Sequence, residues 1–197
     1  LNTGGMGAVA SRSLIDSELL KQIESHVIEP SVEGLIKDNL DFKGFLYAGL
    51  MLTKDGPKVL EYNCRFGDPE AQAVLPLIKG DFAAYLMSGA KGELIDSLID
   101  FDEGWSICLV LASAGYPNSS RNEDLINGLD LIQDARVYHA GTKKNSEGHY
   151  VTNGGRVLAV VGRGDTRESA VEHSYKEAEK INFDGNQRRS DIGRMHF

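Results

Sequence analysis

Residues 59–70 decide the expected fold and chemistry of this chain; they read Val59-Leu60-Glu61-Tyr62-Asn63-Cys64-Arg65-Phe66-Gly67-Asp68-Pro69-Glu70. The apolar start predicts a β-strand, and side chains two residues apart on a strand share one face. Glu61 and Asn63 therefore present a carboxylate and an amide oxygen to one small volume, which suits magnesium. Arg65 adds a fork of donors that fits phosphate oxygens. A metal beside an arginine indicates phosphoryl transfer, whereas the alternative is a strand end with solvated polar side chains.

The neighbouring sequence predicts helices and strands in alternation. Helical spacing of apolar residues with a proline inside predicts two helical pieces within residues 16–38, broken near Pro30. A buried strand at 45–52, the turn Asp55-Gly56 and the strand at 58–64 predict an antiparallel hairpin. Asp68 is expected to cap a helix that starts at Pro69, and short helices are expected near 69–78 and 81–89.

The second half of the chain predicts a separate small domain. Strands are expected at 105–113, 135–140 and 150–162, the last interrupted by a turn or bulge at Asn153-Gly154-Gly155. One helix follows, with Asp165 as its expected cap and a buried face formed by Ala170, Val171, Ser174, Tyr175, Ala178 and Ile181. The predicted division is a first domain at 1–90, a linker at 91–103 and a second domain at 104–197.

Composition limits the classes of protein that this chain can represent. Its 197 residues are 25% charged and 41% hydrophobic, which is typical of a globular protein, and the net charge is −8. That charge argues against a nucleic-acid surface, and no run of 18 apolar residues predicts a membrane span. Cys64 and Cys108 lie in apolar runs, so both are expected to be buried and reduced, as in the cytoplasm.

Other candidate site residues lie in glycine-rich or capping positions. The segment at 3–7 can approach an anion with its backbone amides, but no Gly-Lys-Ser/Thr follows, so it is not a P-loop. Asp68 and Glu70 have a second explanation as helix-capping residues. Arg156 stands at a glycine turn that leads into an apolar strand, which fixes its position. The start in a glycine loop without methionine suggests a fragment.

Five motifs together resemble the phosphoribosylamine–glycine ligases, ATP-grasp enzymes of purine biosynthesis. They are Asn2-Thr3-Gly4-Gly5-Met6-Gly7-Ala8, residues 44–51 (Gly-Phe-Leu-Tyr-Ala-Gly-Leu-Met), residues 61–70, His139-Ala140-Gly141-Thr142 and residues 151–160 (Val-Thr-Asn-Gly-Gly-Arg-Val-Leu-Ala-Val). They occur in the family's order across nearly the whole chain. The resemblance implies an α+β fold, in which the closing part of an ATP-grasp catalytic domain, an antiparallel sheet with helices, precedes a small α+β C-terminal domain.

The same resemblance implies the reaction and the residues that carry it. ATP, glycine and 5-phosphoribosylamine would be the substrates, with glycyl phosphate as the intermediate. Glu61 and Asn63 would bind Mg²⁺ or Mn²⁺, and Arg65 would stabilise the transferred phosphoryl group or the tetrahedral oxyanion. The substrate pocket would be formed by Asn2, Thr3, Gly4, Gly5, Met6, Gly7, Asp68, Glu70 and Arg156.

The resemblance also implies that an N-terminal domain and an ATP-clamping domain are missing from this chain. The 197 residues alone are therefore expected to bind ATP poorly and to make no product. Two alternatives stay open. One is another ATP-grasp carboxylate–amine ligase or carboxylase, since such enzymes would share Glu-x-Asn-x-Arg, and the other is a non-catalytic truncated module.

Overall fold

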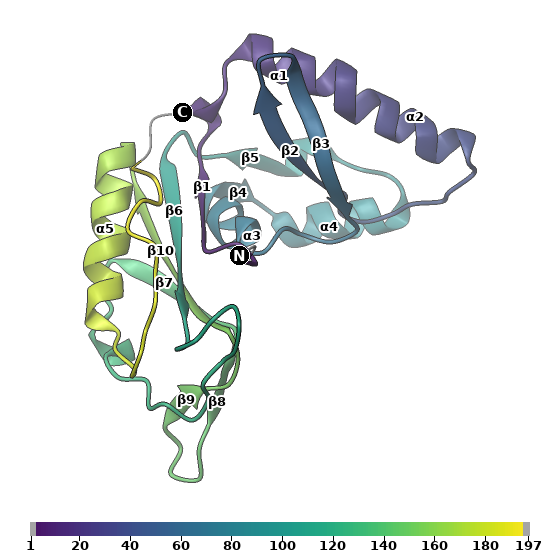
Figure 1. Ribbon diagram of the computed structural model, residues 1–197. Coiled ribbons are helices and arrows are strands. Elements are labelled where there is room, and N and C mark those ends of the chain that lie inside the picture. The colour runs from purple at the N-terminus through teal and green to yellow at the C-terminus, as the bar shows by residue number, and fades with distance from the viewer. Residues whose placement is uncertain (1–2, 195–197) are drawn as a thin grey trace. The chain divides into compact units, whose positions relative to one another are not determined.

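The computed structural model describes residues 3–194 and has the α+β fold that the sequence predicts (Figure 1). Its contacts divide the chain into two compact units. Unit 1 consists of the described parts of residues 1–11, 68–77 and 102–197, and unit 2 consists of residues 12–67 and 78–101. The predicted limits of the two domains, at residues 90 and 104, stay a prediction. Within residues 3–194, no helix is both long and apolar enough to cross a membrane.

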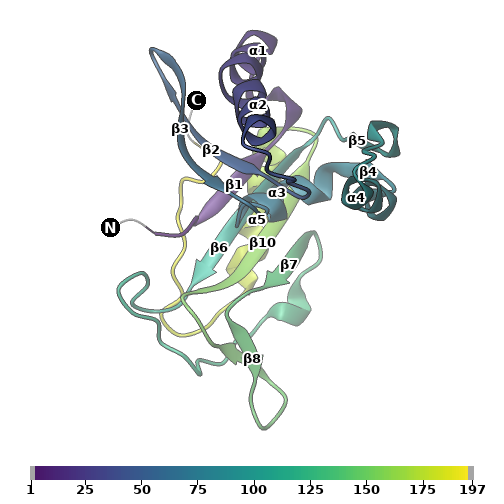
Figure 2. The ribbon, with the colours of Figure 1, turned by 90° about the vertical axis from the view of Figure 1, so that its right-hand side faces the viewer.

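Unit 1 is built on a four-stranded antiparallel sheet in the order β1-β6-β10-β7. Its strands are β1 (Gly7–Ala10), β6 (Trp105–Ala112), β10 (Arg156–Gly164) and β7 (Ala135–His139), and its helices are α3 (Glu70–Val74) and α5 (Arg167–Lys180). Smaller elements are the 3₁₀ turns η3 (Leu75–Leu77) and η5 (Leu129–Leu131) and the hairpin β8 (Thr142–Lys144) with β9 (Tyr150–Thr152). Figures 1 and 2 show α5 along one face of the sheet.

The central strand β6 separates two apolar layers because its side chains alternate between the faces of the sheet. Ile107, Leu109 and Leu111 pack with α5, whereas Cys108 packs with the small layer that contains Ala73 of α3. A register shift between Arg156 and Leu158 marks a bulge at the start of β10, just after residues 153–155, where the sequence predicts a turn or bulge. The sequence had predicted one strand over 150–162, and the turn at 153–155 divides it into β9 and β10.

Helix α5 buries the face that its periodicity predicts, but it begins one residue later than expected. All six predicted side chains, from Ala170 to Ile181, are at most 9% exposed. The cap is Thr166 rather than Asp165, because Thr166 accepts the Ser169 amide while the Ser169 hydroxyl accepts the Thr166 amide. This reciprocal pair satisfies two helix-end donors, which Asp165 with Glu168 does not.

A fully buried carboxylate, Glu177, ties α5 to the segment before β7. It accepts the Gln133 amide at 2.8 Å and the Lys180 ammonium at 2.6 Å, and Lys180 also donates to the Leu131 carbonyl at 3.1 Å. Burial alone raises the pKa of Glu177, but the hydrogen bonds from Lys180 and Gln133 outweigh it and lower the pKa below its usual range.

Because the folded-state pKa of Glu177 is depressed, its ionised form stabilises the fold above the unfolded-state pKa, about 4.3. That contribution is lost as the pH falls through the folded-state pKa. Urea unfolding at pH 7 and at pH 3 is expected to show a smaller acid-induced loss of unfolding free energy for Glu177→Gln than for the parent chain. The variant is also expected to be less stable at pH 7, by about 1–3 kcal/mol. An identical loss in both proteins would contradict this assignment.

Unit 2 contains the elements that lie between the segments of unit 1. They are η1 (Arg12–Leu14), α1 (Ser17–Ile23), the π turn η2 (Glu24–Ile28), α2 (Glu29–Lys37), β2 (Tyr47–Thr53), β3 (Gly56–Asn63), β4 (Ile78–Gly80), α4 (Phe82–Lys91), η4 (Asp96–Leu98) and β5 (Ile99–Phe101). The predicted hairpin is confirmed as β2 and β3, but its first strand is not buried as expected, since Met51 is 51% and Leu52 54% exposed. The predicted break near Pro30 is wrong, because α1, η2 and α2 follow one another with helical backbone at each junction. The irregularity is the π turn that ends two residues before Pro30, and Pro30 lies in the first turn of α2, where its missing N–H costs least.

The two cysteines differ in exposure, so the expectation that both are buried is correct for one of them. Cys108 is fully buried in β6, whereas Cys64 is exposed directly after the end of β3. Burial, followed by the negative charges of Asp68 and Glu70, raises the pKa of Cys108 to about 12, while Arg156 opposes the shift. Cys108 therefore stays a neutral, unreactive thiol.

Candidate functional site

In unit 2, Glu61 and Asn63 lie on one face at the end of β3 and contact each other. Asn63 Nδ2 donates to Glu61 Oε1 at 2.9 Å. Glu61 is paired with Gly49 of β2, where a Cβ atom would lie 3.1 Å from Glu61 Cγ. A larger residue at position 49 would therefore displace the Glu61 side chain, so the glycine leaves the space that Glu61 occupies.

The separation of these two side chains fits a small hard cation. A half-turn of the Asn63 amide would exchange its nitrogen and its oxygen. Asn63 Oδ1 would then lie about as far from Glu61 Oε1 as Asn63 Nδ2 does now, which is 2.9 Å. An octahedral ion with metal–oxygen distances of about 2.0–2.1 Å holds adjacent ligands about 2.9 Å apart. Among residues 3–194 no cluster of three or more His, Cys, Asp or Glu side chains could hold a metal. A cation at this pair would need further ligands from substrate phosphates and water, which is how Mg²⁺ is commonly held.

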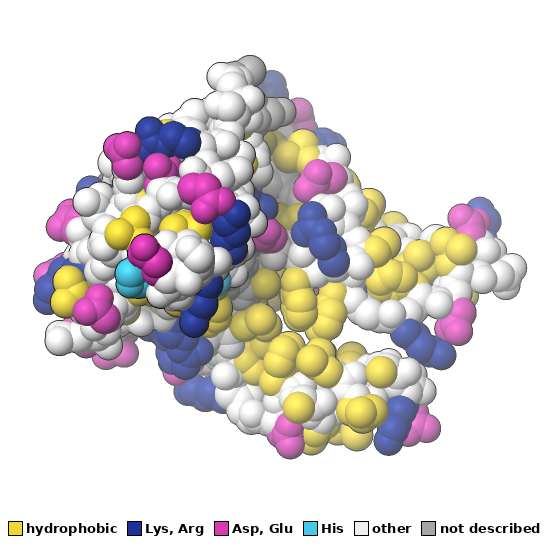
Figure 3. Space-filling view, turned by 90° about the horizontal axis from the view of Figure 1, so that it is seen from below, with side chains coloured by type: hydrophobic (Ala, Val, Ile, Leu, Met, Phe, Trp, Pro, Cys, Tyr) yellow, Lys and Arg dark blue, Asp and Glu magenta, His cyan; other side chains and the backbone are white. Residues whose placement is uncertain are grey.

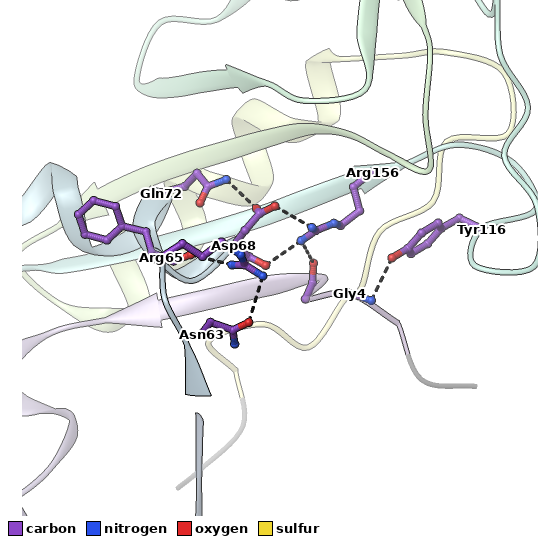
Figure 4. Close-up of polar contacts among 9 residues, drawn as sticks. Gly4, Asn63, Arg65, Asp68, Gln72, Tyr116 and Arg156 are labelled. Carbon is purple, nitrogen blue, oxygen red and sulfur yellow. Dashed lines mark hydrogen bonds and ion pairs between the residues drawn. The ribbon is translucent and has the colours of Figure 1, made fainter. Parts of the chain in front are cut away.

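Arg65 follows the pair and is fixed mainly by its own backbone neighbour. Its Nη1 donates to the Phe66 carbonyl at 2.7 Å, and its Nη2 makes a longer contact of 3.4 Å with Asn63 Oδ1 (Figure 4). The Phe66 ring stacks on Phe45 with centroids 3.7 Å apart, which steadies this turn. Arg65 is exposed, and within residues 3–194 its other guanidinium N–H groups make no hydrogen bond, so they can face an anion.

In unit 1, Arg156 and Asp68 form a second cluster of predicted site residues. Arg156 Nη2 donates to Asp68 Oδ2 at 2.7 Å, and its Nη1 donates to the Asp68 carbonyl at 2.8 Å and to the Gly5 carbonyl at 3.2 Å. Gln72 Nε2 donates to the other Asp68 oxygen at 2.9 Å. Asp68 is therefore not the helix cap that the sequence predicts; Pro69 occupies that position and the carboxylate turns to Arg156 instead.

The glycine-rich segment is partly a strand rather than a free loop. Gly7 begins β1 and pairs with Leu109, and the Met6 carbonyl accepts the Val110 amide at 3.1 Å. Gly4 donates its amide to the Tyr116 hydroxyl at 3.0 Å. Thr3 is exposed, Glu70 begins α3 and is half-buried, and Asn2 lies outside the described residues.

Two residues in this cluster are absent from the sequence-based set. Gln72 stands four residues after Asp68, at which the sequence predicts the start of a helix, and residues with this spacing on a helix lie side by side, so Gln72 could have been found. Tyr116 lies in the turn after β6, more than 100 residues from Gly4, and no local pattern connects them.

Comparison with known proteins decides the family. Residues 1–71 match the family described as "Phosphoribosylglycinamide synthetase, ATP-grasp (A) domain", and residues 106–195 match "Phosphoribosylglycinamide synthetase, C domain". The chain belongs to the phosphoribosylglycinamide synthetase family. Phosphoribosylamine–glycine ligase of Caldanaerobacter subterraneus is 46% identical over 97% of this chain and 46% of its own length. The trifunctional purine biosynthetic protein adenosine-3 of Chironomus tentans is 41% identical over the whole chain and 15% of its own length.

Solved structures support the same family. The crystal structure of phosphoribosylamine–glycine ligase from Thermotoga maritima matches with a TM-score of 0.85 and 35% identity over 97% of this chain and 47% of that chain. A biotin carboxylase domain from Hydrogenobacter thermophilus matches with a TM-score of 0.64 at 17% identity over 93% of this chain and 40% of that chain, which shows a shared fold alone. The chain spans about half the length of the ligases that it matches.

Proposed function

We propose that this chain is the C-terminal half of a phosphoribosylamine–glycine ligase, which joins glycine to 5-phosphoribosylamine with ATP. The observation that carries the proposal is the family match over both parts of the chain, together with the Glu61–Asn63–Arg65 arrangement at the end of β3. The terminal phosphoryl group of ATP would pass to the glycine carboxylate, giving ADP and glycyl phosphate. The amine of 5-phosphoribosylamine would then attack the acyl carbon, form the amide of glycinamide ribonucleotide and release phosphate. We place this reaction in the cytoplasm.

The residues at the end of β3 would hold the phosphate end of ATP. Glu61 and Asn63 would bind Mg²⁺ or Mn²⁺, which when bound neutralises charge on the phosphate oxygens. Arg65 would donate to the transferred phosphoryl group or to the tetrahedral oxyanion, where a preformed donor lowers the barrier most. Its bond to the Phe66 carbonyl limits the freedom of the guanidinium before substrate arrives.

The cluster around Arg156 would form the wall of the glycine and 5-phosphoribosylamine pocket. Each carboxylate oxygen of Asp68 accepts one hydrogen bond, and the side chain is half-exposed. Each oxygen can accept a further hydrogen bond, so Asp68 can still bind a substrate amine. The glycine segment from Asn2 to Gly7, with Glu70, would line the same pocket. Arg156 is mostly occupied with Asp68 and Gly5, so we expect it to act on substrate chiefly through them.

The proposal is tested by assaying the 197-residue chain and a complete ligase that contains it. The complete enzyme is expected to release ADP only when both glycine and 5-phosphoribosylamine are present, and to form glycinamide ribonucleotide detectable by mass spectrometry. The chain alone is expected to give no product above background, because the N-terminal and ATP-clamping domains that the resemblance implies would be missing from the site. Glycine-independent but bicarbonate-dependent ADP release would favour a carboxylase instead. Product formation by the chain alone would refute its dependence on the remaining domains.

A further inference from the structure

Tyr116 contacts two glycine-rich segments of unit 1 that are far apart in sequence. Its hydroxyl accepts the Gly4 amide at 3.0 Å (Figure 4). Its ring lies against Gly155. It stands in the turn after β6 and is half-buried. The turn that carries Arg156 and the segment that precedes β1 therefore meet at one side chain.

The glycines at these contacts are needed for space. Neither Gly4 nor Gly155 has a positive φ, so neither position needs glycine for a left-handed backbone conformation. A Cβ atom at Gly155 would, however, lie 2.4 Å from Tyr116 Cδ2, and a Cβ atom at Gly4 would lie 3.1 Å from the Tyr116 hydroxyl. The Tyr116 ring therefore leaves no room for a side chain at position 155, whereas a Cβ atom at position 4 would press on the Tyr116 hydroxyl and on the Arg156 guanidinium.

Arg156 completes the connection, because its guanidinium bonds the next residue of the same segment. Its Nη1 donates to the Gly5 carbonyl, while Nη1 and Nη2 hold the carbonyl and carboxylate of Asp68. Tyr116 and Arg156 thus hold two adjacent residues of the glycine segment, Tyr116 through the Gly4 N–H and Arg156 through the Gly5 C=O. The segment, Asp68 and the Gly155–Arg156 turn are linked into one body.

We propose that Tyr116 is a positioning residue, whose hydroxyl and ring hold the glycine segment and the Arg156 turn in the geometry that receives substrate. This rests on the proposed function, which assigns those two segments to the glycine and 5-phosphoribosylamine pocket. A tyrosine that only fills space would work equally well as phenylalanine. The role of Tyr116 therefore depends on the oxygen atom as well as on the ring.

The first test is kinetic and uses the complete ligase with Tyr116→Phe. We expect the KM for glycine or for 5-phosphoribosylamine to rise about 2- to 10-fold, the effect of one neutral hydrogen bond, while the KM for ATP stays unchanged. Tyr150→Phe is the matched control, because this exposed tyrosine packs against His139 in a tilted arrangement and lies outside the cluster. Unchanged values for all substrates, or an equal rise for ATP, would overturn the proposal.

The second test uses the clash between Gly155 and the ring. Gly155→Ala alone is expected to lower kcat/KM for glycine or for 5-phosphoribosylamine at least 10-fold. Tyr116→Ala removes the ring, so adding Gly155→Ala to that variant is expected to change kcat/KM less than 2-fold. Fully additive losses would overturn the contact on which the proposal depends, and melting curves of all three variants identify any that fail to fold.

A third measurement separates this proposal from the proposed function. In the 197-residue chain, amide-proton exchange of Gly4 by nuclear magnetic resonance is expected to be faster in Tyr116→Phe than in the parent chain. Equal exchange would overturn the hydrogen bond itself. If the complete protein makes no glycinamide ribonucleotide, the proposed function fails, and the assigned role of Tyr116 fails with it even where Gly4 exchange changes. If it makes product but Tyr116→Phe alters exchange without altering any KM, only the positioning role fails.

Discussion

Arg65→Ala in the complete ligase is expected to lower kcat about 100- to 1,000-fold, the usual effect of removing a preformed donor to developing negative charge. Within residues 3–194 the guanidinium donates only to the Phe66 carbonyl and, at a longer distance, to Asn63 Oδ1. Its other N–H groups therefore remain for the substrate. Because the side chain is exposed and buries no apolar core, its loss is expected to leave the melting temperature nearly unchanged. Steady-state assays at saturating ATP with a parallel melting curve measure both effects.

Two further variants sharpen this experiment. Arg65→Lys keeps the positive charge but loses the planar fork, so its kcat is expected to lie between those of the parent and the alanine variant. Arg136→Ala removes an exposed arginine from β7 and is expected to leave kcat within 2-fold of the parent. Near-normal turnover in Arg65→Ala would remove this residue from the phosphoryl site.

Local periodicity in the sequence predicted the elements that carry the proposed chemistry. Strand alternation places Glu61 and Asn63 on one face, and the structure shows them in hydrogen-bond contact. Helical spacing predicted the buried face of α5, since both rules depend only on neighbouring residues. Where two adjacent residues could serve as a cap, as at Asp165 and Thr166, the outcome depended on a partner three residues on.

Contacts between distant segments could not be predicted in the same way. Strand β1 pairs with β6, about 100 residues further along the chain, and nothing near Gly7 indicates that partner. The bonds from Arg156 to Asp68 and from Gly4 to Tyr116 have the same character. The sequence does not predict the exposure of Cys64 because its apolar neighbours suggest a core, whereas strand β3, directly before it, exposes most of its side chains.

The two units differ sharply in how much apolar surface they bury. Nearly all buried hydrophobic side chains of residues 3–194 belong to unit 1, whereas in unit 2 Val27 is buried, at 3% exposed. Unit 2 instead exposes large side chains such as Ile36 at 70% and Leu60 at 64%; exposed hydrophobic side chains are yellow in Figure 3. Its β2–β3 hairpin is a sheet of only two strands, and such hairpins are marginally stable alone.

In the 197-residue chain, backbone amides of unit 1 are therefore expected to exchange more slowly than those of unit 2. Amides of β6 and β10 should stay protected, whereas those of β2 and β3 should exchange orders of magnitude faster, since local stability follows buried apolar contact. In the complete ligase, where the proposed remaining domains would cover the hairpin, its amides should become protected. Equal protection of all four strands in the chain alone would show that unit 2 is stable without further covering.

A pair of matched substitutions tests the same difference without exchange data. Leu109→Ser removes a fully buried side chain of β6 and is expected to destabilise the chain by about 2–5 kcal/mol, enough to abolish its cooperative unfolding transition. Leu60→Ser changes a side chain that is 64% exposed and is expected to alter that transition by less than about 0.5 kcal/mol. In the complete ligase the second substitution should become costly, because the leucine would then be covered. A Leu60→Ser variant that stays neutral there would show that this face of the hairpin remains open to solvent in the complete enzyme.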